Sequence, residues 1–197
     1  MNDYFKGIMD VVNKSIEDLD IDTFERLVDD VHRTLTGKGK VVITGLGKNA
    51  PICEKFVGTM LSLGLEATFV HTNTAMHGDI GCIRNDDIVL VLSKSGKTEE
   101  SVKFLNYIMG LKDRKPLIWA MTFDAGSPLA VSAPNTLALS LEKEGDEWNK
   151  VPNNSTTVYL IVLQALAMQV AGRMKVSIET FNSNHPGGAI GEDARKG

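Results

Sequence analysis

The 197-residue sequence contains only two cysteines, Cys53 and Cys82, and both lie in apolar stretches without the spacing of metal ligands. A disulfide framework and a structural zinc site are therefore not expected. We expect both thiols to be reduced and buried in the core of an intracellular protein.

The sequence also lacks an excess of positive charge and a long hydrophobic run. Its formal net charge is −4 at pH 7, and its lysines and arginines are scattered evenly, so it has no basic face for nucleic acid. No apolar run approaches the ~18 residues of a membrane span. The start carries Asp3, Lys6 and Asp10 where a signal peptide needs an apolar core. A nucleic-acid partner, secretion and membrane insertion are disfavoured, and we expect a cytoplasmic location.

The hydrophobic content and the length of the sequence are sufficient for one hydrophobic core. Hydrophobic residues make up 43% of the sequence, and its length is ordinary for one domain. We expect residues 1–197 to form a single domain. Apolar positions at helical spacing predict helices at 3–17 and 22–36, with Asp22 as the N-cap of the second, so that residues 1–38 form a helical lead.

Continuous apolar runs predict five β-strands, at 41–44, 67–70, 88–92, 117–122 and, more weakly, 136–139. Strands without polar alternation are covered on both faces. Helical patterns follow at 51–63, 98–111, 155–173 and 177–181. The predicted fold class is α/β, a doubly wound five-stranded parallel sheet flanked by helices in a three-layer α/β/α arrangement. In such a sheet the ligand site lies at the carboxyl ends of the strands.

The first predicted strand ends in a glycine turn that opens onto a helix, Gly45 to Asn49. Unpaired backbone N–H groups and the helix dipole favour an anion there, which makes Gly47, Lys48 and Asn49 candidate binding residues. Ala50 stands where a dinucleotide fingerprint has its third glycine, and the ending of a Walker loop is missing. NAD and ATP are therefore disfavoured.

The third predicted strand ends in S-K-S-G-K-T, three hydroxyls around a glycine at a helix start. Such a loop can surround a phosphate with O–H and N–H donors, to which lysines add charge. It can also be a solvated N-cap with a capping box, but its place directly after a strand favours phosphate binding. Hydroxyls at 155–157 begin the long helix and either add donors or only cap it. The candidate phosphate or substrate contacts are Ser93, Lys94, Ser95, Lys97, Thr98, Ser155 and Thr156.

A phosphate cradle without a nucleotide signature indicates a small phosphorylated metabolite. Four acid–base candidates accompany it in loops that are expected to follow strands: Lys48, His77, Glu100 and His185. A single loop histidine is more often structural or solvated than catalytic. All four together favour acid–base chemistry on the bound metabolite.

Five segments occur in a fixed order along the chain: G-L-G-K, A-M-H-G-D-I-G, S-K-S-G-K-T-E-E, N-S-T-T and H-P-G-G. In this the sequence resembles the arabinose-5-phosphate isomerases, a family of sugar-isomerase (SIS) domains, over residues 40–191. The resemblance implies a five-stranded parallel sheet, a homotetramer, and interconversion of D-ribulose 5-phosphate and D-arabinose 5-phosphate without a metal or organic cofactor. It further implies a supply of Kdo for lipopolysaccharide or capsule.

The same resemblance assigns roles to residues of this sequence. It places the catalytic set on Lys48, His77, Glu100 and His185, and phosphate contacts on the hydroxyls of the two loops named above. An enediol reaction needs a base beside C1 and C2, which would be Glu100, with its pKa raised by burial. Lys48 would stabilise the enediolate oxygen, while His185 would open the ring or relay protons and His77 would position hydroxyls or share the role of His185. In the family the H-P-G-G histidine reaches a neighbouring subunit's site.

Three departures from the family pattern limit the transfer, of which one is Leu163 and Gln164 on the long helix together with Asn49 after Lys48. The usual S-N-S-G-E is replaced by S-K-S-G-K, so that Lys94 and Lys97 are expected to make the site more attractive to anions. A downstream acidic sugar or its CMP-activated form is then a candidate inhibitor. The pair of CBS domains that most members carry is missing from the sequence, so regulation through such modules is not expected.

Two other readings stay open. One is an isomerase for another phosphosugar, such as a hexulose 6-phosphate or an amino sugar. The other is a non-catalytic sugar-phosphate sensor, although no helix-turn-helix segment precedes the domain, and a sensor has no evident use for four acid–base residues.

Overall fold

The computed structural model describes residues 2–189 and 191 and contains one five-stranded sheet. The strands are β1 (Val41–Gly45), β2 (Ala67–Phe69), β3 (Ile88–Leu92), β4 (Leu117–Thr122) and β5 (Asn135–Ala138). Their order is β2-β1-β3-β4-β5, and every neighbouring pair is parallel. The predicted doubly wound α/β fold is confirmed, with each strand boundary within about two residues of its prediction.

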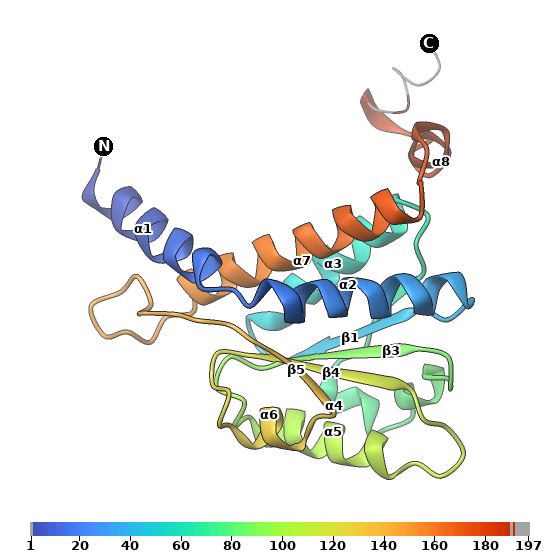
Figure 1. Cartoon of the computed structure of the whole chain (residues 1–197), viewed down its shortest axis with the longest axis horizontal. Helices are drawn as coiled ribbons and strands as arrows, with labels where there is room; N and C mark the ends of the chain where they lie inside the picture. Colours follow the sequence, from blue (N-terminus) through green and yellow to red (C-terminus); the bar gives the residue numbers. More distant parts are fainter. Residues whose placement is uncertain (1, 190, 192–197) are drawn as a thin grey trace.

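Helices cover both faces of this sheet (Figure 1). One layer contains α1 (Asp3–Glu17), α2 (Ile21–Thr36), α3 (Asn49–Ser62) and α7 (Asn154–Arg173). The other contains α4 (Thr72–Ala75), the short 3₁₀ helix η1 (Asp79–Cys82), α5 (Glu99–Gly110) and α6 (Pro128–Ser132). The last helix, α8 (Ile178–Ser183), lies beyond the end of α7.

Alternate residues of each central strand belong to different cores, because successive side chains of a strand point to opposite faces. Ile88, Leu90 and Leu92 of β3 pack in the core under α2, α3 and α7, whereas Val89 and Val91 pack with α5. All five are fully buried. This explains why the strands appear in the sequence as unbroken apolar runs.

The structure corrects three details of the prediction. The N-cap of α2 is Asp20, whose carboxylate accepts hydrogen bonds from the Thr23 backbone N–H at 3.1 Å and its hydroxyl at 2.8 Å, whereas Asp22 lies in the first turn. Cys53 is buried as expected, but Cys82 is exposed. Helix α7 is, by length and mean hydropathy of 1.4, apolar enough to cross a membrane, yet it packs against α1, α2 and α3.

The chain leaves the sheet in opposite directions after its two central strands. Helix α3 follows β1 onto one face, and α5 follows β3 onto the other, while β1 and β3 are paired from Val41–Ile88 to Gly45–Leu92. The loops at the carboxyl ends of these two strands therefore diverge from a common point. Ligands of open α/β sheets bind in the crevice at such a switch point.

Candidate active site

The loop after β1 presents Lys48 at the start of α3. Gly45 lies so close to that helix that a Cβ on it would be 2.9 Å from the Cβ of Asn49. Gly47 has φ +61°, a left-handed conformation that favours glycine. Lys48 is the exposed N-cap residue, and no side chain caps the helix there. The backbone N–H groups of Asn49 and Ala50 donate to the carbonyls of Leu46 and Gly47, each at 3.2 Å, and Pro51 has no N–H. The predicted backbone anion site at this turn is therefore not provided, and the Lys48 side chain is the group of the turn that can meet an anion.

Lys48 and Thr156, two residues predicted to share a site, line the same hollow of about 340 Å³ between the starts of α3 and α7. Pro51, Lys55 and Pro152 also line it. The Thr156 hydroxyl donates to the Asn153 carbonyl at 2.7 Å. The Lys48 side chain and the Thr156 hydroxyl, which come from different elements, therefore line one hollow.

The loop after β3 is held in one shape by its glycine. Gly96 has φ +60°, and a Cβ on it would lie 1.9 Å from the Ser127 Oγ, so no other residue fits without displacement. Within the loop, the buried Ser93 hydroxyl donates to Thr98 Oγ1 at 3.1 Å, and Ser95 Oγ accepts from the Lys97 backbone N–H at 3.2 Å. Thr98 is the N-cap of α5 but makes no side-chain capping bond. The capping-box alternative is therefore not what shapes this loop.

Both lysines of the loop after β3 have acidic partners. Lys94 Nζ lies 2.7 Å from Glu144 Oε1, and Lys97 Nζ lies 2.9 Å from Asp124 Oδ2. The hydrogen bond from Lys97 lowers the pKa of Asp124. The expectation that these two lysines make the site more attractive to anions is corrected, because each positive charge already faces a carboxylate.

Glu144 is the residue of this site that the sequence analysis missed. It follows β5, and its side chain is fully buried. Its Oε2 accepts hydrogen bonds from the backbone N–H groups of Asn153 and Ser155, each at 3.1 Å, and its Oε1 accepts from the Ser155 hydroxyl at 2.5 Å. Glu144 thus satisfies free N–H groups at the start of α7. The Ser155 hydroxyl, predicted as a substrate donor, is instead used within the protein.

The contacts of Glu144 keep it ionised. Burial alone would raise the pKa of its carboxyl, but hydrogen bonds from Lys94, Ser155 and the Asn153 backbone outweigh burial, and the pKa lies below the ordinary glutamate value. A carboxylate stabilised in this way is a weak base. The only sequence signal for it is an acidic residue eleven positions before the hydroxyl that it binds.

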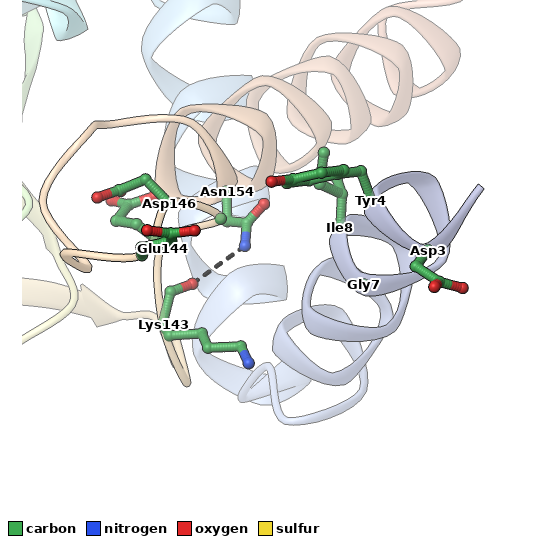
Figure 2. A pocket seen from close by; sticks show the side chains of 10 residues that line it. Asp3, Tyr4, Gly7, Ile8, Lys143, Glu144, Asp146 and Asn154 are labelled. Atoms are coloured by element: carbon green, nitrogen blue, oxygen red, sulfur yellow. Dashed lines mark hydrogen bonds between the residues drawn. The ribbon is translucent and has the colours of Figure 1, made fainter.

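A second hollow, of about 310 Å³, lies on the other side of the Glu144 loop, between that loop and α1 (Figure 2). Asn154, buried beneath it, donates from Nδ2 to the Lys143 carbonyl at 3.1 Å. Tyr4 and Ile8 of α1 form the opposite wall. The loop that carries Glu144 is therefore covered by the N-terminal helix.

Three of the four predicted acid–base residues are exposed: Lys48, His77 and Glu100. Glu100 lies in the first turn of α5, directly after the phosphate-binding candidates. The burial expected to raise its pKa is therefore not provided by its own chain. His77 is separated from β2 by helix α4 and is also exposed, with its backbone N–H donating to the Thr74 carbonyl at 2.9 Å.

His185 lies near the end of α3, far from Lys48 at its start. The neighbouring Asn184 donates to the carbonyls of Leu61 and Ser62 at the end of α3, whereas Lys48 is at its start. The His185 ring lies 4.1 Å from that of Phe181, and its Nδ1 is 2.7 Å from the Phe181 carbonyl. Since a carbonyl only accepts, Nδ1 carries hydrogen, and Nε2 of the neutral ring is the acceptor.

Within residues 2–189 and 191, no three His, Cys, Asp or Glu side chains gather as metal ligands. The doubly wound sheet, its switch point and a hydroxyl-rich loop at a helix start together define an α/β domain with a candidate phosphate-binding loop. The comparisons with known proteins agree. A model of the SIS domain matches residues 34–169, and the chain belongs to the SIS-domain family.

Curated relatives and a solved structure give a finer view. The chain is 41% identical over 157 residues to the Pseudomonas aeruginosa arabinose 5-phosphate isomerase KdsD, covering 80% of this chain and 47% of that protein. It is 38% identical over 172 residues to arabinose 5-phosphate isomerase GutQ of Escherichia coli K12, covering 85% and 52%. The chain spans about half the length of these relatives. A solved E. coli CFT073 protein in complex with arabinose 5-phosphate superposes with a TM-score of 0.85 at 30% identity, covering 93% of this chain and 94% of that one.

Proposed function

We propose that this chain is an aldose–ketose isomerase that interconverts D-ribulose 5-phosphate and D-arabinose 5-phosphate. The observation that carries the proposal is the pairing of the rigid Ser93–Thr98 loop with Lys48 across the β1–β3 switch point. The likeness to curated arabinose 5-phosphate isomerases at 41% and 38% identity supports the choice of substrate.

The phosphate binds the loop after β3 in this proposal. The hydroxyls of Ser95 and Thr98 and the first N–H groups of α5 are the donors, because this helix start faces the carboxyl edge of the sheet. The sugar then extends toward Lys48 and Thr156, which line one hollow. C1 and C2 of the substrate then lie between Lys48 at the start of α3 and Glu100 in the first turn of α5.

The chemistry moves protons only and so requires no cofactor. A base removes a proton from C1 of the ketose, the C2 oxygen gains a proton to give the enediol, and the reverse steps at O1 and C2 give the aldose. We assign the base to Glu100 and stabilisation of the developing oxyanion to Lys48. Because Glu100 is exposed in the single chain, the bound sugar and a neighbouring chain must cover it for its basicity to rise.

His185 comes from a second copy of the chain in this proposal, and His77 positions the sugar hydroxyls. The support is geometric, since His185 and Lys48 are at opposite ends of α3. A homotetramer in the cytoplasm that supplies Kdo for lipopolysaccharide or capsule is the biological setting that we propose. An acidic or CMP-linked sugar as inhibitor is a weaker proposal, because Lys94 and Lys97 are paired.

The test is direct. Metal-free protein is incubated with D-ribulose 5-phosphate, and the products are separated chromatographically from D-arabinose, D-ribose and D-xylulose 5-phosphates. Arabinose 5-phosphate is the expected product. A different aldose product would be consistent with the enediol mechanism but would change the assigned sugar-phosphate pair. Sugar-phosphate binding without turnover would indicate a non-catalytic sensor instead of an enzyme.

A further inference from the structure

The ion pair between Lys94 and Glu144 joins two loops that are distant in the sequence. Lys94 lies between Ser93 and Ser95 of the loop after β3, and Glu144 lies in the loop between β5 and α7. The carboxylate side chain has no exposed surface, and the lysine side chain is 37% exposed. A buried charge is costly without a partner, so the position of each group depends on the other.

The backbone of Lys94 makes a third connection. Its carbonyl accepts hydrogen bonds from the Phe123 backbone N–H at 3.0 Å and from the Thr122 hydroxyl at 3.1 Å. Lys94 therefore contacts the end of β4 through its backbone and Glu144, in the loop after β5, through its side chain. It links the strand-end loops after β3, β4 and β5.

Glu144 connects Lys94 to the start of α7 through hydrogen bonds. Its three hydrogen bonds from Asn153 and Ser155 fix the first turn of the helix, where Thr156 faces the hollow that it shares with Lys48. A shift of the Glu144 carboxylate would move this turn relative to the phosphate loop. The Lys94 ammonium group is occupied by this contact and is not a spare phosphate ligand.

We propose that Lys94 is a positioning residue, which through its ion pair with Glu144 holds the start of α7 in register with the Ser93–Thr98 loop. This inference deepens the proposed isomerase function and rests on it. Lys94 acts on the reaction through Glu144 and α7 and does not contact the reacting atoms.

The charge state of Glu144 gives the proposal a measurable signature. In the described part of the chain, Lys94 is the cation within ion-pair distance of Glu144. The other ionisable groups beside it are Asp3 and Tyr4 of α1, and Lys143, Asp146 and Glu147 of its own loop. Figure 2 shows the Lys143 side chain extending away from the Glu144 carboxylate. Without Lys94 the largest of the interactions that lower the pKa of Glu144 is lost, while the hydrogen bonds from Ser155 and Asn153 remain, so that pKa is expected to rise relative to wild type.

The experiment compares Lys94→Met and Lys94→Arg with wild type. For Lys94→Met we expect kcat/KM on D-ribulose 5-phosphate to fall about tenfold or more, since small misplacements in a site cost up to ~10²-fold. The acidic limb of its pH profile moves to higher pH. Lys94→Arg retains the charge, recovers most of the activity and keeps the wild-type limb. Lys103→Met is the matched control, because it removes an exposed lysine–glutamate pair on α5.

A second readout does not depend on turnover. The amide resonance of Ser155, whose N–H donates to Glu144, is followed by NMR as the pH is lowered. Its titration is expected at higher pH in Lys94→Met than in wild type and Lys103→Met. If Lys94→Met does not fold, Lys94→Gln, which also lacks the charge, takes its place in both measurements.

The outcomes separate the two proposals. The positioning role would be overturned if the Ser155 titration and the acidic limb of the pH profile were unchanged in Lys94→Met or its substitute Lys94→Gln. It would also be overturned if that variant lost only affinity for inorganic phosphate. If wild type lacks isomerase activity, the proposed function fails, and the Ser155 titration still decides whether Lys94 positions Glu144.

Discussion

Lys48 and His185 lie at opposite ends of one helix, α3, which has 14 residues. At a rise of 1.5 Å per residue the two ends are separated by about 20 Å, so these side chains of one chain cannot meet on one sugar phosphate. If both take part in the reaction, each active site contains residues from two chains.

Mixing two inactive variants tests this arrangement. Lys48→Ala and His185→Ala are each expected to lose activity, but random exchange of subunits between them restores intact sites at about a quarter of the wild-type number, because each site takes one residue from each of two chains. The measurement is isomerase activity after mixing under conditions that permit exchange. A mixture of Lys48→Ala and Glu100→Gln is the control. It stays inactive, since both residues come from the same chain, and recovery there would contradict the assignment.

The base assignment is tested at the start of α5. Glu100→Gln is expected to lower kcat by about 10²–10⁴-fold, the usual contribution of a general base. Glu99→Gln, the adjacent change, removes only an exposed ion pair with Lys103 and leaves kcat near wild type. The measurement is the steady-state kcat of both variants. A decrease in kcat of less than about tenfold for Glu100→Gln would show that Glu100 is not the general base.

The Ser93–Thr98 loop, which we propose binds the phosphate, requires glycine at position 96. Gly96→Ala brings a Cβ to 1.9 Å from the Ser127 Oγ at φ +60°, so we expect unfolding free energy to fall by about 1–3 kcal/mol and phosphate binding to weaken. Urea unfolding and calorimetry with D-arabinose 5-phosphate measure both effects. Gly7 lies in helix α1, and a Cβ added there would have no atom within 4 Å. Gly7→Ala is therefore expected to raise the unfolding free energy by up to about 1 kcal/mol.

Glu144 makes the stability of the fold depend on pH. The folded-state pKa of its carboxyl is lowered, so its contribution is present above the unfolded glutamate pKa and is lost as pH falls through the folded value. Glu144→Gln should therefore cost about 1.5–3 kcal/mol at pH 7, the range for a hydrogen-bonded charge, and progressively less in acid. Unfolding curves across acidic pH test this. Glu142→Gln, at an exposed position of the same loop, should show no such convergence.

The elements of the fold could be predicted because their signals are local. The fully buried strands β1 and β3 are unbroken apolar runs in the sequence, and the glycines and hydroxyls after them mark the turns that open onto α3 and α5. The N-cap of α2 was misplaced from Asp20 to Asp22, because two acidic residues two positions apart give nearly the same capping signal. Cys82 was placed in the core from its apolar neighbours, but η1 leaves it exposed.

The electrostatics of the site could not be predicted in the same way. Glu144 stands in a charged stretch that is typical of a solvated loop, and its burial depends on Lys94 and Ser155. Lys97 appeared to be a free cation until the fold placed Asp124 beside it. Whether a charge is paired or desolvated depends on groups that are distant in the sequence.

The sequence by itself determined the strand and helix pattern, the parallel α/β class and the position of a hydroxyl-rich loop after β3, because hydrophobic periodicity and turn chemistry act over a few residues. Only the tertiary structure decided which lysines are paired, which carboxylate is buried, and that His185 lies at the far end of α3 from Lys48. Those properties arise where separate segments meet, and the energy of a charge there is set by the burial and the partners that the packed chain provides.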